Sequence, residues 1–326
     1  MRLVRHPILA NYYVTYRCNA SCGFCDIWEK PSPYVTPEAV ANNLDALKRL
    51  GVKVVDFTGG EPLLHRDLPK MLAMAKERGF ITTVTTNCLL YPKFAQDLVG
   101  VVDMLHFSLD SPIAEEHNKS RNVNCFDHFV RSIEVAKKLG QRPDILFTVF
   151  GHNVHQIQEV YDLFCKPNNL VLILNPVFEY NEKAKDEQLS PQQLRALRAW
   201  ATKPGVYLNE GFIDLRLRGG NQIDAPVCRA ASTTIVISPE DKLLLPCYHL
   251  GLEALPINGD LDTLWRSPAV QQLVRMEGRH EACQGCTINC YMQPSFAVEL
   301  SQYWWSALPS TLKYNRMKGT WKQLFA

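Results

Sequence analysis

The feature that most constrains the fold is an alternation of apolar, β-rich runs with helical patterns between residue 8 and about residue 200. The predicted strands are Ile8–Tyr16, Lys53–Thr58, Phe80–Thr86, Met104–Leu109, Ile145–Phe150 and Leu170–Pro176. The predicted helices are Pro37–Leu50, Leu68–Arg78, Pro92–Leu98, Phe126–Leu139, Val154–Phe164 and Pro191–Ala201. Such a succession predicts an α/β fold, a partial (β/α)6 barrel of the TIM type, with right-handed crossovers and functional loops at the carboxyl ends of the strands.

Three cysteines, Cys18, Cys22 and Cys25, directly follow the first predicted strand. Thiolates at this spacing can hold one metal centre, because the small residues and glycine between them let the backbone curl. A four-iron cluster usually takes four cysteines, and the next one, Cys88, lies far along the chain. A cluster here would keep one iron without a protein thiolate, as in a reactive site. A zinc site completed from elsewhere and disulfides in a secreted protein are the alternatives.

The composition is that of an ordinary globular enzyme, with 46% hydrophobic and 21% charged residues among 326. A formal charge of +2 gives no excess of basic residues that would indicate binding to nucleic acid. The eleven cysteines are odd in number, and the short apolar run near the N-terminus is interrupted by Asn11. No secretory signal peptide is therefore predicted, and a reducing cytoplasm is the expected location.

The CxxxCxxC segment, with Phe24 before its last cysteine, resembles the radical S-adenosylmethionine (SAM) enzymes. The resemblance implies that Cys18, Cys22 and Cys25 hold a catalytic [4Fe-4S] cluster. It also implies that the amino acid end of SAM chelates the remaining iron, with Phe24 in the cofactor site.

The turn after the second predicted strand, Gly59-Gly60-Glu61-Pro62, is similar to the GGEP motif of that family. The resemblance implies that its backbone and the Glu61 carboxylate hold the amino group of SAM. Two glycines also let a ligand approach the backbone closely. The alternative is a tight turn with a capping glutamate.

Later strand ends carry further similarities. Asn87 ends a segment similar to the family's Thr-Asn-Gly, although Cys88 replaces the glycine. Ser108 and Asp110 resemble its Ser-x-Asp segment, which implies contacts to the SAM ribose, and the alternative is that they cap the next helix. Arg121 matches a basic position of the family and is a candidate for the SAM carboxylate or the substrate, with Asn122 where a glycine is usual.

The C-terminal third has a different pattern. Residues 233–246 alternate as a β-hairpin bracketed by Cys228 and Cys247, and a CxxC at Cys283 and Cys286 follows, then Cys290. This arrangement resembles the twitch and SPASM domains, which carry auxiliary iron–sulfur clusters. Once the scattered Cys88, Cys125 and Cys165 are set aside as buried small residues, five thiols remain, enough for one four-thiolate cluster. The expected ligands are Cys228, Cys247, Cys283 and Cys286, with Cys290 as spare or substitute, and a zinc ribbon is the alternative.

We therefore expect a radical SAM core over 1–212, a small hairpin-plus-helix domain with the auxiliary cluster over 213–292, and a closing segment over 293–326. The last segment is rich in aromatic residues: Tyr291 just before it, then Phe296, Tyr303, Trp304, Trp305, Tyr314, Trp321 and Phe325. We expect it to pack across the open side of the barrel. A wall for a large hydrophobic substrate and a contact to a membrane surface are alternatives.

The resemblance implies an enzyme that cleaves SAM to a 5′-deoxyadenosyl radical, which abstracts hydrogen from a C–H bond. An electron donor such as flavodoxin or ferredoxin is implied, and the auxiliary cluster favours a net oxidation. The expected substrate is an organic metabolite of a biosynthetic pathway, with a tetrapyrrole or other large hydrophobic intermediate as one possibility. A ribosomal peptide ranks second, because the first strand begins by residue 8 and leaves no room for a leader-recognition domain. A zinc-stabilised binding protein is the alternative from another class.

Overall fold

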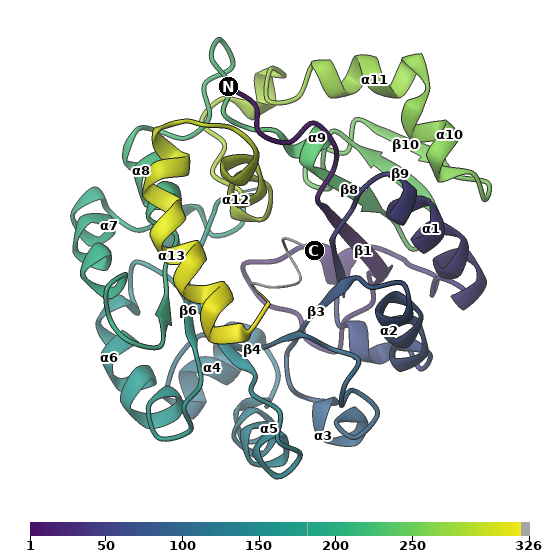
Figure 1. The fold of residues 1–326 in the computed structure, drawn as a ribbon. Helices are drawn as coiled ribbons and strands as arrows, with labels where there is room; N and C mark the ends of the chain where they lie inside the picture. Colours follow the sequence, from purple (N-terminus) through teal and green to yellow (C-terminus); the bar gives the residue numbers. More distant parts are fainter. Residues whose placement is uncertain (181, 321–326) are drawn as a thin grey trace.

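A curled, open sheet organises the computed structural model, which describes residues 1–180 and 182–320 (Figure 1). Within those residues the strand order is β10-β9-β8-β1-β2-β3-β4-β5-β6-β7. Pairing is parallel from β8 through β1 to β7 and antiparallel between β8 and β9 and between β9 and β10. The strands are β1 Leu9–Thr15, β2 Val54–Gly59, β3 Ile81–Thr86, β4 Met104–Leu109, β5 Asp144–Val149, β6 Leu172–Pro176, β7 Val206–Tyr207, β8 Thr234–Ile237, β9 Lys242–Leu245 and β10 Glu253–Pro256.

Helices surround this sheet, and α13 crosses its inner side (Figure 1). They are α1 Pro37–Arg49, α2 Leu68–Glu77, α3 Tyr91–Phe94, α4 Ala114–Arg121, α5 Phe126–Lys138, α6 Ile157–Val160, α7 Pro191–Leu197, α8 Glu210–Leu217, α9 Ala230–Thr233, α10 Leu261–Arg266, α11 Pro268–Arg275, α12 Asn289–Val298 and α13 Gln302–Lys318. In the part of the chain that is described, none of them is long and apolar enough to cross a membrane.

Helix α1 illustrates how local sequence sets an element. Thr36 caps its start by accepting a hydrogen bond from the Ala39 backbone N–H, and Pro37 follows at the first helical position. Val40, Leu44 and Leu47 lie on one face at three- and four-residue spacing and are fully buried. The helix therefore covers the outer face of the sheet.

The sheet is buried on both faces. In β5, Ile145, Phe147 and Val149 belong to the large core between the sheet and the outer helices, whereas Leu146 packs beside Tyr314 of α13 on the inner face. Successive side chains of a strand point to opposite faces, so α13 fills part of the barrel interior.

The six predicted strands and the parallel, barrel-like α/β sheet are confirmed. Three predicted helices differ from the observed ones, one in length and two in helix type. Residues 92–98 are helical only within α3, and residues 191–201 form α7 followed by a short 3-10 turn. Residues 154–164 divide into a 3-10 turn, the short α6 and a π-helical turn that ends at Cys165.

Helix α4 was missed by the sequence analysis. Its buried side chains are His117 and Arg121, and nearly every other position is polar, so no apolar stripe marks it. A search for hydrophobic periodicity could not detect this helix because its buried face is polar.

The predicted hairpin is confirmed as β8 and β9, which pair at Ile237 and Leu243. It extends the barrel sheet instead of forming a separate one, because β8 lies parallel to β1 with Ala10 opposite Ile235. The division of the chain at residues 212 and 292 stays a prediction.

The C-terminal helix α13 packs against α8 and the edge strand β7. Tyr314 donates a 2.6 Å hydrogen bond to the Asp144 carboxylate, and Lys318 forms a 2.9 Å ion pair with it. Of the predicted aromatic segment, Phe296, Tyr303 and Tyr314 are buried, whereas Trp305 is 65% exposed. Trp321 and Phe325 lie outside the described residues.

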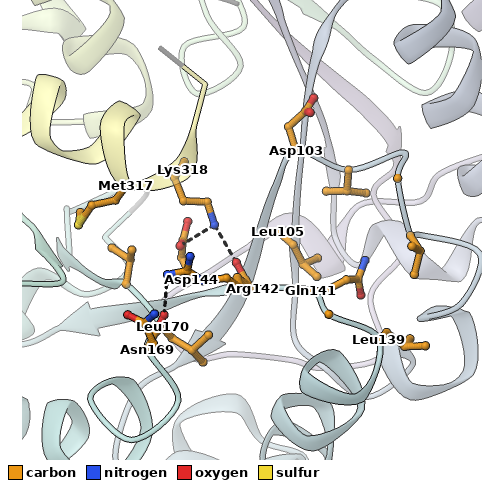
Figure 2. A pocket seen from close by; sticks show the side chains of 15 residues that line it. Asp103, Leu105, Leu139, Gln141, Arg142, Asp144, Asn169, Leu170, Met317 and Lys318 are labelled. Atoms are coloured by element: carbon orange, nitrogen blue, oxygen red, sulfur yellow. Dashed lines mark hydrogen bonds and ion pairs between the residues drawn. The ribbon is translucent and has the colours of Figure 1, made fainter. Parts of the chain in front are cut away.

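A cavity of about 310 Å³ lies at the amino ends of β4, β5 and β6, lined by Asp103, Asp144, Asn169, Met317 and Lys318 among others (Figure 2). Two ion pairs stand at this cavity: Lys318 contacts Asp144, and Lys76 contacts Asp103. The predicted site residues lie at the opposite, carboxyl ends of the strands, so this cavity is separate from them.

Candidate functional site

The predicted SAM-cluster cysteines lie on one loop at the carboxyl end of β1, and the end of α4 holds that loop. The Ser21 backbone N–H donates to the Arg121 carbonyl at 3.3 Å, and Gly23 donates to the Ser120 carbonyl at 3.4 Å. Asn122, which adopts a left-handed conformation with φ of 52°, donates from its side chain to Ser21 Oγ at 2.8 Å. Asparagine tolerates that conformation, so it can replace the glycine usual here.

The thiols of this loop are largely shielded from water. Burial raises the pKa of Cys18 to about 12 and that of Cys25 to about 11, and it also raises the pKa of Cys22. The negative charge of each neighbouring thiolate raises these values further for Cys18 and Cys25. Such thiols are inert alone and become thiolates when a metal binds, so the donor set fits an iron–sulfur cluster.

The glycines after β2 are required by their contact with the cysteine loop. A Cβ at Gly59 would lie 2.1 Å from the Thr15 carbonyl oxygen, and one at Gly60 would lie 2.4 Å from the Arg17 carbonyl oxygen. Backbone hydrogen bonds of 3.0 Å from Gly60 to Thr15 and 2.9 Å from Glu61 to Arg17 join the two loops. This close packing sets the GGEP turn against the start of the cysteine loop.

Glu61 connects the ends of β2 and β3. Its carboxylate accepts hydrogen bonds from the Leu63 N–H at 3.1 Å, Thr86 Oγ1 at 2.9 Å and the Asn87 N–H at 2.8 Å. It is 1% exposed, and burial raises its pKa to about 7. The carboxylate is thus engaged by its own chain, and its contact to the SAM amino group stays a prediction.

Asn87 reaches the cysteine loop from β3. Its side-chain amide donates to Asn19 Oδ1 at 2.7 Å and lies 4.0 Å from Cys18 Sγ. Cys88, which follows it, is buried and has a φ of 71°. The cysteine therefore takes the left-handed conformation for which the family's glycine is suited.

Asp110 and Arg121 form a buried ion pair of 2.8 Å, and Ser120 Oγ donates to Asp110 at 3.0 Å. Burial opposes ionisation of Asp110, but the Arg121 guanidinium outweighs it and holds the pKa of this carboxyl below its ordinary value. Arg121 also lies over the Phe24 ring at 5.8 Å, and its buried Nε has no hydrogen-bond partner within the described residues. Arg121 therefore has a free donor beside the cysteine loop.

Two residues that support Asp110 were missed. His117 Nδ1 accepts a 3.2 Å hydrogen bond from the Asp110 N–H, and its Nε2 lies 3.3 Å from Cys125 Sγ. The Asn153 amide donates to the Asp110 carbonyl at 2.7 Å. The sequence offered only a histidine among the polar residues of α4 as a signal for His117. It could not be used because α4 itself was not predicted.

The five C-terminal cysteines come together from separate segments. Cys228 precedes α9, Cys247 follows β9, Cys283 and Cys286 stand in one loop, and Cys290 lies in the first turn of α12. The charges of Cys247 and Cys286 raise the pKa of both Cys228 and Cys290, after burial as the main cause. Cys283 raises the pKa of Cys247 and Cys286 in the same way, so the five thiols are electrostatic neighbours. No group of three or more metal-binding side chains among residues 1–180 and 182–320 is close enough to hold a single ion.

Asn221, which the sequence analysis missed, ties these segments together. Its amide donates to the carbonyls of Gly278 at 2.8 Å and Cys283 at 3.1 Å, and its oxygen accepts from the Val227 and Cys228 N–H groups at 3.0 and 3.1 Å. The side chain is completely buried. Both N–H donors and both lone pairs of this amide are thereby engaged.

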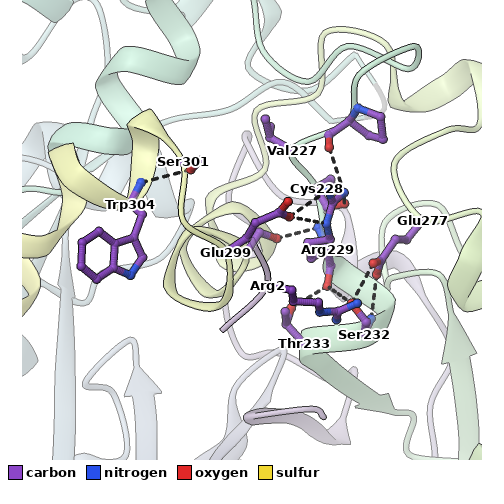
Figure 3. Close-up of polar contacts among 12 residues, drawn as sticks. Arg2, Val227, Cys228, Arg229, Ser232, Thr233, Glu277, Glu299, Ser301 and Trp304 are labelled. Carbon is purple, nitrogen blue, oxygen red and sulfur yellow. Dashed lines mark hydrogen bonds and ion pairs between the residues drawn. The ribbon is translucent and has the colours of Figure 1, made fainter. Parts of the chain in front are cut away.

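Contacts of two charged residues, Arg229 and Glu277, also hold the segment that contains Cys228 (Figure 3). Arg229 forms a 2.9 Å ion pair with Glu299 and donates to the Cys228 carbonyl at 3.1 Å. Glu277 accepts from Ser232 N and Ser232 Oγ, each at 2.7 Å. Since Glu299 directly follows the last residue of α12, its ion pair with Arg229 joins the Cys228 segment to the helix that carries Cys290.

An aromatic cluster lies between the two cysteine groups. The Tyr248 ring, directly after Cys247, stacks on Tyr13 at 4.5 Å and lies 5.7 Å from Tyr16. Its hydroxyl accepts a 2.8 Å hydrogen bond from Lys30, which follows the first cysteine loop. Tyr248 thus packs the C-terminal cysteine group against the end of β1.

A surface hollow of about 540 Å³ opens beside the first cysteine loop. Cys18 lines it together with Arg17, Lys30 and the partly exposed rings of Trp28 and Tyr34. The hollow gives the neighbourhood of Cys18 a route to the protein surface.

The thiols of Cys18, Cys22 and Cys25 thus stand at the carboxyl end of β1 in an open, mainly parallel α/β barrel. Residues 12–164 match the family model of the Radical SAM superfamily.

Three curated proteins illustrate the relationship. Fe-coproporphyrin III synthase of Methanosarcina barkeri is 31% identical, over 49% of this chain and 41% of its own length. A probable GTP 3′,8-cyclase of Sulfurisphaera tokodaii is 28% identical, over 72% and 80%. AdoMet-dependent heme synthase of Nitratidesulfovibrio vulgaris is 29% identical, over 48% and 44%. The matches to the two synthases span less than half of those proteins.

Solved structures share the fold at low sequence identity. Streptococcus suis SuiB bound to S-adenosylmethionine has a TM-score of 0.65 and 19% identity, over 92% of this chain and 78% of that one. The enzyme anSMEcpe with bound AdoMet and Cp18Cys peptide has a TM-score of 0.63 and 17% identity, over 98% of both chains. The architecture of the whole described chain is thus that of these partial barrels.

Proposed function

We propose that this chain is a radical SAM enzyme that abstracts hydrogen from a C–H bond of an organic metabolite in a biosynthetic pathway, in a net oxidation. The observation that carries the proposal is the loop of Cys18, Cys22 and Cys25 at the carboxyl end of β1, within the residues that match the Radical SAM family model. When bound there, a reduced [4Fe-4S] cluster supplies the electron that splits SAM into methionine and a 5′-deoxyadenosyl radical.

The residues of the chain hold and orient the cofactors. Cys18, Cys22 and Cys25 would hold three irons of the cluster and would leave the fourth for SAM. Arg121 Nε, buried and without a partner in the described chain, can donate to the SAM carboxylate. Ser108 and Asp110 are proposed to face the ribose, with Asp110 kept ionised by Arg121.

Four of the five C-terminal thiols, from Cys228, Cys247, Cys283, Cys286 and Cys290, are proposed to hold an auxiliary [4Fe-4S] cluster in a twitch-like segment. Their gathering around Cys247 and Cys286 supports this set, as does the chemistry of thiolate ligands. Tyr248 connects this group with the SAM-cluster loop. The residues between them would place the substrate where an electron can leave it.

The proposed substrate class is a tetrapyrrole or similarly large conjugated intermediate. Two relatives are named Fe-coproporphyrin III synthase and AdoMet-dependent heme synthase, and the interior between the cysteine groups is aromatic. We propose a cytoplasmic location and a flavodoxin or ferredoxin as electron donor, which would approach Cys18 through the hollow lined by Arg17 and Lys30.

The test is anaerobic purification followed by iron analysis and incubation with SAM and dithionite. We expect brown protein with about eight irons per chain, from two four-iron clusters, and formation of 5′-deoxyadenosine. Addition of iron coproporphyrin III should increase that formation if a tetrapyrrole is the substrate. A colourless zinc protein would contradict the proposal.

Cys22→Ala should abolish 5′-deoxyadenosine formation. Cys165→Ala is the matched control, because Cys165 is a buried cysteine at the end of the π-helical turn, far in sequence from both groups. Undiminished formation by the Cys22 variant would refute the role assigned to this loop.

A further inference from the structure

His249 lies in an aromatic cage beside the auxiliary cysteines. Its ring makes edge-on contacts with Phe178 at 5.5 Å, Tyr180 at 4.4 Å, Tyr248 at 5.2 Å and Tyr291 at 5.9 Å between centroids. These rings come from the end of β6, from the segment after β9 and from α12. Packing from several elements therefore fixes the orientation of the imidazole.

The two ring nitrogens of His249 have different surroundings. Nε2 lies 3.9 Å from Cys290 Sγ, within reach of a hydrogen bond to sulfur. Nδ1 is buried and has no hydrogen-bond partner within the described residues. A proton on Nδ1 would be a buried donor without an acceptor, whereas a proton on Nε2 points to the sulfur. The surroundings favour the tautomer that donates to Cys290.

Cys290 packs against the buried cluster that contains Tyr13 of β1, together with Tyr248 and Tyr291. This contact places it toward the barrel strand. Cys283, in contrast, stands next to the exposed Gln284 and Gly285. The fifth thiol therefore has an interior position with a hydrogen-bond donor of its own.

We propose that Cys290 is the ligand on the barrel side of the auxiliary centre and that His249 is a positioning residue that donates a hydrogen bond from Nε2 to its sulfur. This inference rests on the auxiliary iron–sulfur centre proposed above. A donor to a coordinating thiolate withdraws electron density and raises the reduction potential of the centre. His249 thus makes the centre a better acceptor for the electron that leaves the substrate.

The experiment uses the holoenzyme with both clusters and compares His249→Leu and His249→Gln with the wild type. His280→Leu is the matched control, because His280 also has a buried nitrogen without a partner in the described chain but lies beside Cys283. Electron spin echo spectra of protein labelled with ¹⁵N-histidine report nitrogen coupled to the auxiliary cluster, and a redox titration reports its midpoint potential.

We expect a histidine nitrogen coupling that is lost in His249→Leu and retained in His280→Leu, with a lower midpoint potential in His249→Leu that His249→Gln partly restores. Two clusters with unchanged coupling and potential in His249→Leu would overturn this inference and leave the proposed function intact. About four irons in the wild type would instead refute the auxiliary centre itself. If His249→Leu fails to retain its iron, the test uses the histidine nitrogen coupling of the wild type and the midpoint potential of His249→Gln. Absence of that coupling in the wild type would then overturn the inference.

Discussion

The two cysteine groups of this protein are held in different ways. Cys18, Cys22 and Cys25 share one loop, and the end of α4 supports it through backbone hydrogen bonds to Ser21 and Gly23. The C-terminal thiols come from four separate segments, and the buried Asn221 amide joins two of them, at Cys228 and at Cys283. The first group is local in the sequence, and the second exists only when distant segments fold together.

This difference predicts different sensitivities. A local loop keeps its ligand spacing when its surroundings loosen, whereas a group assembled from distant segments loses its geometry when one connecting side chain is removed. The following changes are ordered from the largest expected effect to the smallest.

Replacing Arg121 with Met should have the largest effect on stability. It leaves the Asp110 carboxylate buried without its counter-ion, which costs about 3–5 kcal/mol. Urea unfolding of the two proteins measures the loss. Lys119→Met, which removes an exposed charge from the same helix, is the control and should change stability by about 0.5 kcal/mol or less. Equal stability of both variants would mean that the ion pair does not support the loop.

Replacing Asn221 with Ala should remove the C-terminal cluster and spare the N-terminal one. Four backbone groups lose their partner, and each buried unpaired group costs about 1–3 kcal/mol, so we expect a loss of about 3 kcal/mol or more. Iron should fall from about eight to about four per chain. The control is Gln222→Ala, at the exposed neighbouring position. Full iron content in the Asn221 variant would contradict the claim that the C-terminal cysteine group is the more sensitive of the two.

The pH dependence of the free energy of unfolding should include a contribution from the Glu61 carboxyl group. Its pKa rises from 4.5 in the unfolded chain to about 7 in the folded protein, so the folded state binds its proton more tightly. The contribution of this proton to the free energy of unfolding is complete below about pH 4.5 and is lost as the pH rises through about 7. The free energy of unfolding should change by about 2–3 kcal/mol over this range.

Unfolding free energies measured across this pH range test the Glu61 effect. Glu61→Gln should flatten the slope, whereas Glu115→Gln, at an exposed position on α4, should leave it unchanged. A wild-type slope that survives in the Glu61 variant would assign the effect to another group.

The smallest effect is expected from Thr36→Ala at the start of α1. It removes the cap on the Ala39 N–H and should cost about 1 kcal/mol without changing the iron content of either site. Thermal unfolding and iron analysis measure both quantities. A loss of iron would show that the cysteine groups are sensitive to general destabilisation.

Much of the barrel could be predicted because its strands are apolar runs and its outer helices have a regular apolar stripe, as in Val40, Leu44 and Leu47. The cysteine loop and the GGEP turn were predictable because their residues are contiguous. Their position at adjacent strand ends then follows from parallel pairing.

The remainder depends on packing that no local pattern encodes. Helix α4 buries His117 and Arg121 instead of apolar residues, and Asn221 matters through partners up to 62 positions away. Continuation of the sheet from β1 into β8 likewise joins residues more than two hundred positions apart. Neither a residue type nor a spacing in the sequence signals these contacts.

The most direct test of the account is whether SAM binds the cluster held by Cys18, Cys22 and Cys25. Electron–nuclear double resonance of the reduced protein with SAM labelled with ¹⁵N at its amino group measures this contact. The account predicts a nitrogen coupling that disappears in Cys22→Ala. A cluster with four protein thiolates, whose spectrum does not change when SAM is added, would contradict it.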